Sequence, residues 1–338
     1  MRAYQLTSTD GIDALKAVEL PMPAAQHGQV VVRMHAASLN FRDLMIATGK
    51  YGLANTQSNL IPLSDGAGEV VEVGPGVSRL NVGDRVAGIF HQKWIAGDAT
   101  DDMLGSALGG ELDGVLSEYR AFDAQGLVRI PEHLSYEQAA TLPCAAVTAW
   151  NALFGHRPTQ PGDTVLTLGT GGVSVFAIQF AHAAGARVIA TSSSDEKLQQ
   201  VRELGANDLI NYKQTPDWDE QVLRLTAGRG ADQVVEVGGA GTMPRSIRAV
   251  RRGGQVSVIG VLTSGEGIDP VMVLFKGAIV RGIFVGSREM FDAMNRAITA
   301  NQLQPVIDRT FGFDEAPAAY RHLESGAHVG KVVIKINS

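Results

Sequence analysis

The sequence predicts an α/β protein of two domains, one β-rich and the other a doubly wound parallel sheet. The chain has 338 residues, more than a usual single domain. Residues 1–125 carry short strand-like segments separated by Gly, Pro, Asn and Asp. From Ser135 onward, strand-like and helix-like segments alternate, which is typical of a parallel sheet covered by helices.

Composition excludes several classes of function. The net charge of −6 is spread along the chain without a basic block, so nucleic acid is not an expected partner. The sequence has no apolar run of about twenty residues and no signal-like N-terminus, which predicts a cytoplasmic protein without a membrane span. Cys144 is the single cysteine, so internal disulfides and a multi-cysteine zinc site are excluded.

The β-rich part opens with strand-like residues at 29–36 and 68–73, followed by the turn-rich segment 73–84. This pattern favours a barrel-like antiparallel domain. A glycine- and aspartate-rich loop follows at 92–114. Such a long loop is either a lid or binding loop, or a plain surface excursion.

Ser135 and Gln138 form a capping box, which predicts a helical passage to about Phe154 that is interrupted at Pro143. The final strand, from Lys331, is expected to return to the first domain. The predicted boundaries are 1–125 with 288–338 for the β-rich domain, and 126–287 for the other. Strands are predicted at 164–168, 187–191, 208–212, 233–237, 254–259 and 279–285, and late helices near 289–300 and 315–323.

A glycine turn joins the strand at 164–168 to a helix with apolar residues at helical spacing. Gly169 and Gly171 let the backbone turn sharply and approach a pyrophosphate, while the opening helical turn offers free N–H groups. The pattern reads G-x-G-x-x-S, with Ser174 in the last position. Because a second strand follows at once, the turn predicts a dinucleotide site formed by Gly169, Gly171, Gly172 and Val173.

Several motifs together resemble the zinc-free quinone oxidoreductase branch of the medium-chain dehydrogenase/reductase superfamily, over essentially the whole chain. The resemblance implies a GroES-like catalytic domain, a Rossmann domain and an active site between them. It also implies a homodimer that pairs through the strand at 278–285. The motifs are Asn40-Phe-Arg-Asp43, Gly49-Lys-Tyr51, Gly83-Asp-Arg-Val86, Leu142-Pro-Cys-Ala-Ala-Val-Thr148 and Pro161-Gly-Asp-Thr-Val-Leu166.

Zinc alcohol dehydrogenases of this superfamily hold their catalytic metal with Cys, His and Cys, and the matching positions here are Asn40, Ser64 and Cys144. A single thiolate cannot hold zinc against water, even with Asp65 as a neighbour. We therefore expect no metal, and we interpret Cys144 as a small buried residue.

The nucleotide preference depends on Ser192, which stands where NAD-preferring members carry a carboxylate for the ribose 2′-OH. Serine does not repel a 2′-phosphate, so NADP(H) is expected over NAD(H). Lys197 would add positive charge, or is a solvated helix lysine. By resemblance Tyr212 lies beside the adenosine phosphate, or else it is a packed strand end.

Two more cofactor contacts are implied by the resemblance. Thr148 corresponds to a threonine at the nicotinamide, although a helix threonine that bonds its own backbone is common. Lys331 corresponds to a basic residue on the cofactor phosphates.

Without a metal, an acceptor that delocalises negative charge itself is favoured, such as a quinone or an alkene conjugated to a carbonyl. By resemblance Asn40 and Tyr51 face the cleft as hydrogen-bond donors, and either Tyr51 or water delivers the proton. Otherwise Asn40 is an ordinary turn asparagine, and Tyr51 is an aromatic wall of the pocket. Phe90 and Trp94 line the acceptor pocket, or are core residues. Arg42 and Asp43 are interpreted as structural.

Three functions follow. The first is an NADPH-dependent reductase of quinones or enones, and the second is an alcohol dehydrogenase that works without zinc or with a loosely held metal. The third is a cofactor-binding protein recruited to a non-catalytic role. The residues do not identify the physiological acceptor.

Overall fold

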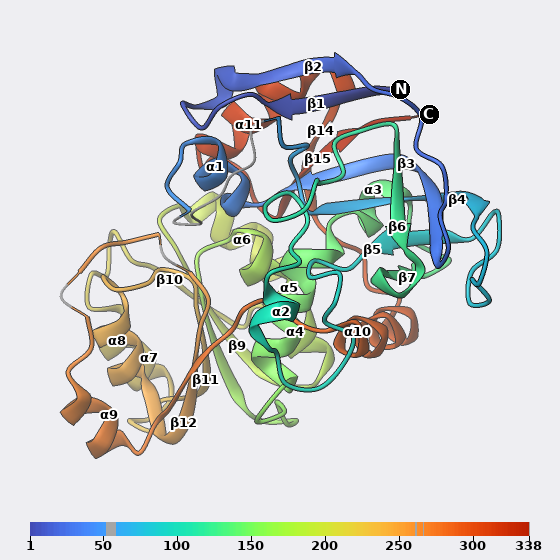
Figure 1. The fold of residues 1–338 in the computed structure, drawn as a ribbon. Helices are drawn as coiled ribbons and strands as arrows, with labels where there is room; N and C mark the ends of the chain where they lie inside the picture. The colour runs from blue at the N-terminus through green and yellow to red at the C-terminus, as the bar shows by residue number, and fades with distance from the viewer. Residues whose placement is uncertain (52–58, 261, 266, 338) are drawn as a thin grey trace. The chain divides into compact units, whose positions relative to one another are not determined.

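The chain folds into two compact units in the computed structural model, which describes residues 1–51, 59–260, 262–265 and 267–337. Unit 1 comprises Met1–Val147 and Gly286–Ser338, and unit 2 comprises Thr148–Val285 (Figure 1). The predicted fold class is confirmed, because unit 1 is built on a mostly antiparallel sheet and unit 2 on a parallel one.

Unit 1 is organised around β3 (Gln29–Leu39), a long strand that is buried along most of its length. It pairs antiparallel with β4 (Asp65–Val73), β6 (Tyr119–Asp123) and β15 (Lys331–Lys335). The sheet runs in the order β14-β15-β3-β4-β5-β7, with β14 parallel to β15. Its remaining strands are β5 (Arg85–Gly88), β7 (Leu127–Arg129) and β14 (Ile307–Gly312), and a separate hairpin-like pair is formed by β1 (Arg2–Leu6) and β2 (Leu15–Glu19).

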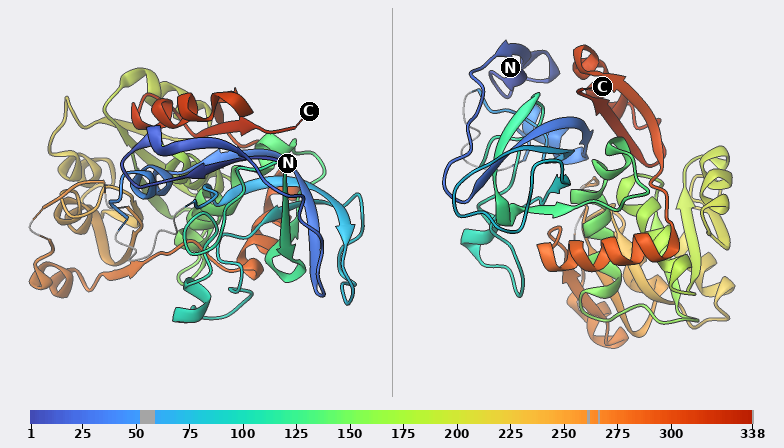
Figure 2. Two further views of the ribbon diagram at one scale, coloured as in Figure 1. Left: turned by 45° about the horizontal axis from the view of Figure 1, so that its top comes forward. Right: turned by 90° about the vertical axis from the view of Figure 1, so that its right-hand side faces the viewer.

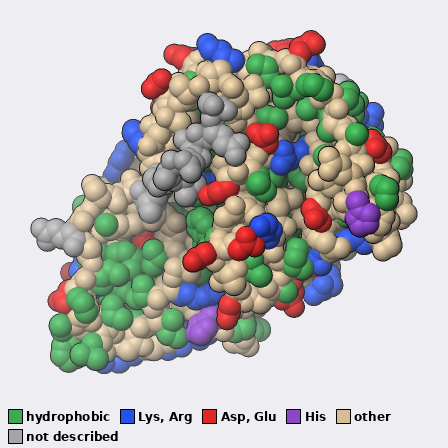
Figure 3. Space-filling model, viewed as in Figure 1, with side chains coloured by type: hydrophobic (Ala, Val, Ile, Leu, Met, Phe, Trp, Pro, Cys, Tyr) green, Lys and Arg blue, Asp and Glu red, His purple; other side chains and the backbone are tan. Residues whose placement is uncertain are grey.

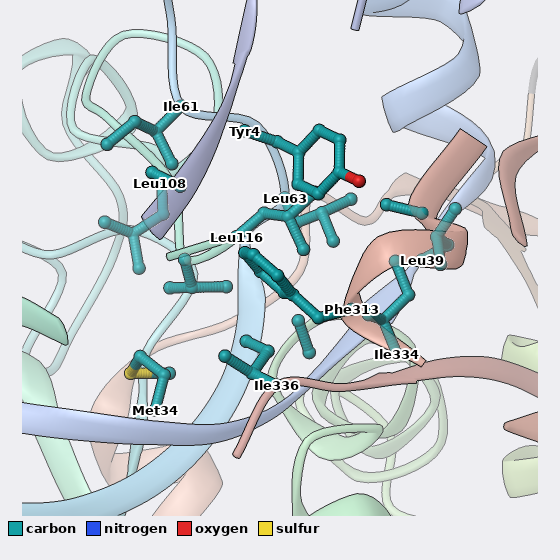
Figure 4. Packing of buried hydrophobic residues seen from close by; sticks show 14 of the residues in the cluster. Tyr4, Met34, Leu39, Ile61, Leu63, Leu108, Leu116, Phe313, Ile334 and Ile336 are labelled. Atoms are coloured by element: carbon teal, nitrogen blue, oxygen red, sulfur yellow. The ribbon is translucent and has the colours of Figure 1, made fainter. Parts of the chain in front are cut away.

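The core of unit 1 joins the two chain ends. Tyr4 packs its ring edge against Phe313 with centroids 5.2 Å apart, and Leu39 and Ile334 pack in the same cluster (Figure 4). Helix α11 (Ala316–Glu324) packs on β14 and β15 (Figure 2). The last strand therefore returns to the first unit, as predicted. The other helices of unit 1 are α1 (Phe41–Ala47), α2 (Asp101–Leu104), α3 (Tyr136–Ala139) and α10 (Arg288–Asn301), with short 3-10 turns at Ile12–Ala14, Ala124–Gly126 and Phe313–Glu315.

The boundary between the units differs from the predicted one, because residues 126–147 belong to unit 1. β7 pairs with β5, and the Cys144 N–H donates to the Asp65 carboxylate at 3.1 Å, so this stretch packs on the β-rich sheet. The capping box at Ser135 is present. The interruption at Pro143 is a π-helical turn, Leu142–Ala146, that runs directly into α4 (Val147–Phe154).

Unit 2 holds a six-stranded parallel sheet in the order β10-β9-β8-β11-β12-β13. This order reverses direction between β8 and β11, and ligands of such sheets bind outside the carboxyl ends of the strands at that reversal. In Figure 1, α7, α8 and α9 lie on one side of the sheet, and α5 and α6 lie on the other. The strands are β8 (Thr164–Leu168), β9 (Arg187–Ser192), β10 (Asp208–Asn211), β11 (Ala231–Glu236), β12 (Val250–Val258) and β13 (Ile279–Gly282), and the helices are α5 (Gly172–Ala183), α6 (Asp195–Glu203), α7 (Trp218–Leu225), α8 (Met243–Ala249) and α9 (Pro270–Lys276).

Among the residues that the structure describes, no helix is long and apolar enough to cross a membrane.

Candidate functional site

The glycine turn of unit 2 leaves β8 at Gly169 and enters α5 at Gly171. Gly169 has a φ of +72°, a conformation that L side chains rarely adopt. A Cβ built on Gly169 or Gly171 would meet no heavy atom within 4 Å. The turn therefore borders open space, and a ligand can approach the backbone at the start of α5, where Gly172 and Val173 lie.

A contact of the Ser174 side chain explains why the third glycine position of the motif holds a serine. Its side chain is buried, and its Oγ donates to the Leu168 carbonyl at 2.6 Å. This bond ties the first turn of α5 to the end of β8. Sequence reasoning recognised the serine but missed this role.

Three predicted nucleotide residues come together at the end of β9. Ser192 is buried there, and its carbonyl accepts from the Tyr212 N–H at 3.0 Å. Ser194 caps α6 by accepting from the Lys197 N–H at 3.3 Å. Thr148, also in unit 2, is buried at the start of α4. Their roles toward a cofactor stay predictions.

Two acidic residues in the first turn of α6 are already engaged by protein groups. Asp195 accepts from Asn211 Nδ2 and from Gln214 Nε2, both at 2.8 Å. Glu196 accepts from the Ser194 hydroxyl at 2.5 Å. Both carboxylates thus have partners other than a ribose hydroxyl.

Glu236, which sequence reasoning missed, organises the end of β11. It is fully buried and accepts from the backbone N–H groups of Gly238 and Gly239 at 2.7 and 3.0 Å. The hydroxyls of Thr242 and Ser246 donate to the same carboxylate. The only sequence signal for this role was its place at the end of an apolar strand pattern, two residues before Gly238-Gly239.

In unit 1, Asn40 caps α1 and meets a residue from the other end of the chain. The Asn40 N–H donates to the Asp43 carboxylate at 2.7 Å. Lys331 Nζ donates to Asn40 Oδ1 and to the Leu39 carbonyl, both at 2.6 Å. The Lys331 side chain is buried, so these protein oxygens hold its ammonium inside unit 1. Its predicted contact with cofactor phosphates stays a prediction.

Asp65 lies in the same cluster and is completely buried. It accepts from the Ser64 hydroxyl at 2.6 Å and from the Cys144 N–H at 3.1 Å, and its Oδ2 lies 3.9 Å from Lys331 Nζ. Burial raises the pKa of Asp65, and the Lys331 ammonium opposes that rise. Burial and the neighbouring Asp65 both raise the pKa of the Cys144 thiol, so the thiol stays protonated.

Among the described residues, no three His, Cys, Asp or Glu side chains converge as a metal site. At the three positions that correspond to zinc ligands, Asn40 Oδ1 receives the Lys331 ammonium, Ser64 donates to Asp65, and Cys144 keeps its proton. An amide, a hydroxyl and a protonated thiol beside a lysine do not fit zinc, which prefers thiolate, imidazole and carboxylate ligands.

The rings of Tyr51 and Phe90 both contact the Arg42 guanidinium. The Arg42 guanidinium carbon is 5.0 Å from the Tyr51 ring centroid and 4.7 Å from that of Phe90. Phe90 and Trp94 are both buried, and Trp94 Nε1 donates to the Gly97 carbonyl at 2.9 Å. That Phe90 and Trp94 also border the acceptor stays a prediction.

Comparisons with known proteins identify the family of the chain. Residues 26–132 match the alcohol dehydrogenase GroES-like domain, and residues 172–300 match the zinc-binding dehydrogenase family. The zinc-type alcohol dehydrogenase-like protein C1773.06c of Schizosaccharomyces pombe is 48% identical over 97% of this chain and 96% of its own length. The 2-methylene-furan-3-one reductase of Solanum lycopersicum is 30% identical over 99% of this chain and 79% of its own.

Solved structures match over the full length as well. An NAD-dependent alcohol dehydrogenase, 32% identical, superposes with a TM-score of 0.91 over 100% of both chains. The quinone oxidoreductase of Coxiella burnetii, 28% identical, superposes with a TM-score of 0.81 over 100% of this chain and 99% of its own.

Proposed function

The chain belongs to the medium-chain dehydrogenase/reductase superfamily, and from this premise we propose that it is a zinc-independent, NADPH-dependent reductase of quinones or enones. That it is an oxidoreductase of this superfamily follows from its relatives. The choice of cofactor and acceptor is the proposal.

One observation carries the proposal. The Lys331 ammonium donates to Asn40 Oδ1 and lies 3.9 Å from Asp65 Oδ2, within the cluster that also contains Ser64 and Cys144. A cation of the protein therefore already lies beside the Asp65 carboxylate of that cluster. Without a Lewis acid, developing charge on a simple carbonyl is poorly stabilised, whereas a quinone or an enone spreads that charge over its own conjugated system.

The cofactor would be held by residues of unit 2. Gly169, Gly171, Gly172 and Val173 would receive the pyrophosphate, because the turn borders open space and α5 begins there. When bound, the dihydronicotinamide supplies a hydride to the acceptor. Thr148 is proposed as a contact of the nicotinamide.

Selection of NADPH over NADH is proposed to depend on Ser192. Its hydroxyl replaces the carboxylate that would repel a 2′-phosphate. The nearby Asp195 carboxylate already accepts two hydrogen bonds from protein side chains, so we do not propose it as the acceptor for a ribose hydroxyl. Lys197, near the start of α6, and Tyr212, whose N–H donates to the Ser192 carbonyl, are proposed phosphate contacts.

One titration followed by an acceptor panel tests the proposal. We expect NADPH to bind the apo protein more tightly than NADH, and quinones or enones to oxidise bound NADPH. Tenfold tighter binding of NADH would overturn the interpretation of Ser192. Turnover of simple alcohols that requires added zinc would instead favour the second candidate, an alcohol dehydrogenase, which the names of two relatives support.

A homodimer is also proposed, with β13 as the pairing strand. β13 is the edge of the unit 2 sheet, and Ile279 and Val280 on it are exposed. Val271, Leu274 and Phe275 of α9 are exposed as well, and Figure 3 shows hydrophobic side chains gathered over that helix. β13 has only four residues, but exposed apolar side chains beside an open sheet edge usually need a cover.

A further inference from the structure

Arg42 is a buried cation that the proposed chemistry has not yet used. Its side chain is 7% exposed, and Nη1 donates to the Leu108 carbonyl at 2.8 Å. Nε and Nη2 are buried without a hydrogen-bond partner among the described residues. The carboxylate of Glu111 lies 3.9 Å from Nη2, too far for a hydrogen bond. The positive charge of Arg42 is therefore only partly compensated.

The loop at 92–114 holds this guanidinium in place. Leu108 supplies the accepting carbonyl, and a Cβ built on Gly110 would overlap Arg42 Nη2. Phe90, just before the loop, packs against the guanidinium carbon at 4.7 Å. These contacts leave the guanidinium little freedom to move away from Tyr51, whose ring centroid is 5.0 Å from it.

We propose that Arg42 is a positioning residue: it holds the Tyr51 phenol in place and stabilises the phenolate that remains after Tyr51 gives its proton to the reduced acceptor. This inference rests on the proposed function. It also assigns a role to the loop at 92–114, which supports Arg42 through Leu108 and Gly110.

The proton step balances as follows for an enone. Once hydride has reached the β-carbon, the acceptor is an enolate. The Tyr51 O–H bond breaks, and the enolate electron pair forms a C–H bond at the α-carbon, which gives the saturated carbonyl compound. The phenolate then takes a proton from water. A fixed cation beside the phenol lowers the cost of this step, because it favours the charged form of Tyr51.

The groups around the Tyr51 phenol shift its pKa in opposite directions. Burial raises the pKa of Tyr51, and the Arg42 charge opposes that rise. Glu111 and Cys144 act in the same direction as burial. Removal of the Arg42 charge should therefore raise the pKa of Tyr51 further, and removal of the Glu111 charge should lower it.

The test introduces a fluorinated tyrosine at position 51, whose phenol ionises at lower pH, and follows its ¹⁹F NMR signal through a pH titration of the apo protein. We expect Arg42→Met to raise the pKa by about one unit or more, and Arg42→Lys to recover part of that shift. Glu111→Gln should shift the pKa in the opposite direction. Arg309→Met is the matched control, because Arg309 lies over the Phe311 ring at 4.6 Å but on the exposed surface.

An unchanged pKa in Arg42→Met, or equal values in Arg42→Met and Arg42→Lys, would overturn the inference. If Arg42→Met does not fold, the pKa of Tyr51 measured in Glu111→Gln tests the inference instead. The Glu111 side chain is partly exposed, and this substitution leaves Arg42 in place. The titration needs no acceptor. A shifted pKa with no turnover of quinones or enones would therefore refute the proposed function and leave the inference about Arg42 standing.

Discussion

Ser192 is the side chain on which we propose that nucleotide choice depends. It lies at the end of β9, and the two acidic residues that follow on α6 have protein partners. In the proposed site, Ser192→Asp would place a carboxylate beside the 2′ position of the cofactor, where it would repel a 2′-phosphate and accept a hydrogen bond from a 2′-OH.

We expect this variant to lose at least about tenfold in affinity for NADPH, which is about 1.4 kcal/mol, and to keep or gain affinity for NADH. Fluorescence titration with both nucleotides measures the ratio. Gln200→Glu on the exposed face of α6 adds the same charge elsewhere and should leave the ratio unchanged. A ratio that shifts equally in both variants would indicate a general charge effect.

Asp43 makes stability depend on pH. Burial raises the pKa of Asp43 to about 6, although Arg42 and the Asn40 N–H oppose that rise. In the unfolded chain the pKa is about 3.9, so between these values the folded state binds the proton more tightly. Stability should therefore fall as pH rises from about 4 to 6.

Asp43→Asn should abolish this contribution, which amounts to at most about 3 kcal/mol. Urea unfolding at several pH values between 4 and 7 measures it. Asp308→Asn serves as the contrast: Asp308 is partly buried, but its hydrogen bond with His322 lowers its pKa, so this carboxylate stabilises the fold as pH rises. If Asp43→Asn kept the pH slope of the wild type, Asp43 would not be its source.

At the scale of elements, the loop at 92–114 is a support and not only a surface excursion. It contains Leu108 and Gly110, which contact Arg42, and Trp94, which is buried. A side chain at position 110 cannot be accommodated without moving the guanidinium.

Gly110→Ala should therefore destabilise the protein by about 1–3 kcal/mol through overpacking. Chemical denaturation measures the change. Gly312→Ala is the control, because Gly312 has an ordinary φ of −72° and an added Cβ would lie no closer than 3.4 Å to another atom. Equal stability of the two variants would mean that the loop yields easily at Gly110.

At the scale of the whole molecule, the exposed edge strand β13 raises the question of assembly. If a second copy pairs with β13, Val280→Lys should convert a dimer into a monomer, because each copy would bring a lysine to the shared edge. Light scattering after size exclusion measures the mass. Val82→Lys, at a residue 65% exposed in unit 1, should leave the mass unchanged. A wild-type monomer would refute the proposed dimer.

Much of this architecture could be predicted from local sequence. Alternating strand and helix patterns identified the six strands of the unit 2 sheet, and the glycine turn placed the start of α5. The unit boundary was harder to predict. The local sequence of residues 126–147 indicates short strands and helices, and either unit could contain such elements. Their contacts with β4 and β5 decide where they belong.

The sequence by itself determined which residue types the site contains: a glycine turn, a serine at the end of β9, and too few zinc ligands at Asn40, Ser64 and Cys144. Tertiary structure alone decided that Lys331 meets Asn40, 291 residues away, and that Leu108 meets Arg42, 66 residues away. The physical reason is that periodicity and turn chemistry act over a few residues. Pairing of buried charges depends on which strands and loops pack together, and that is settled only when the chain folds.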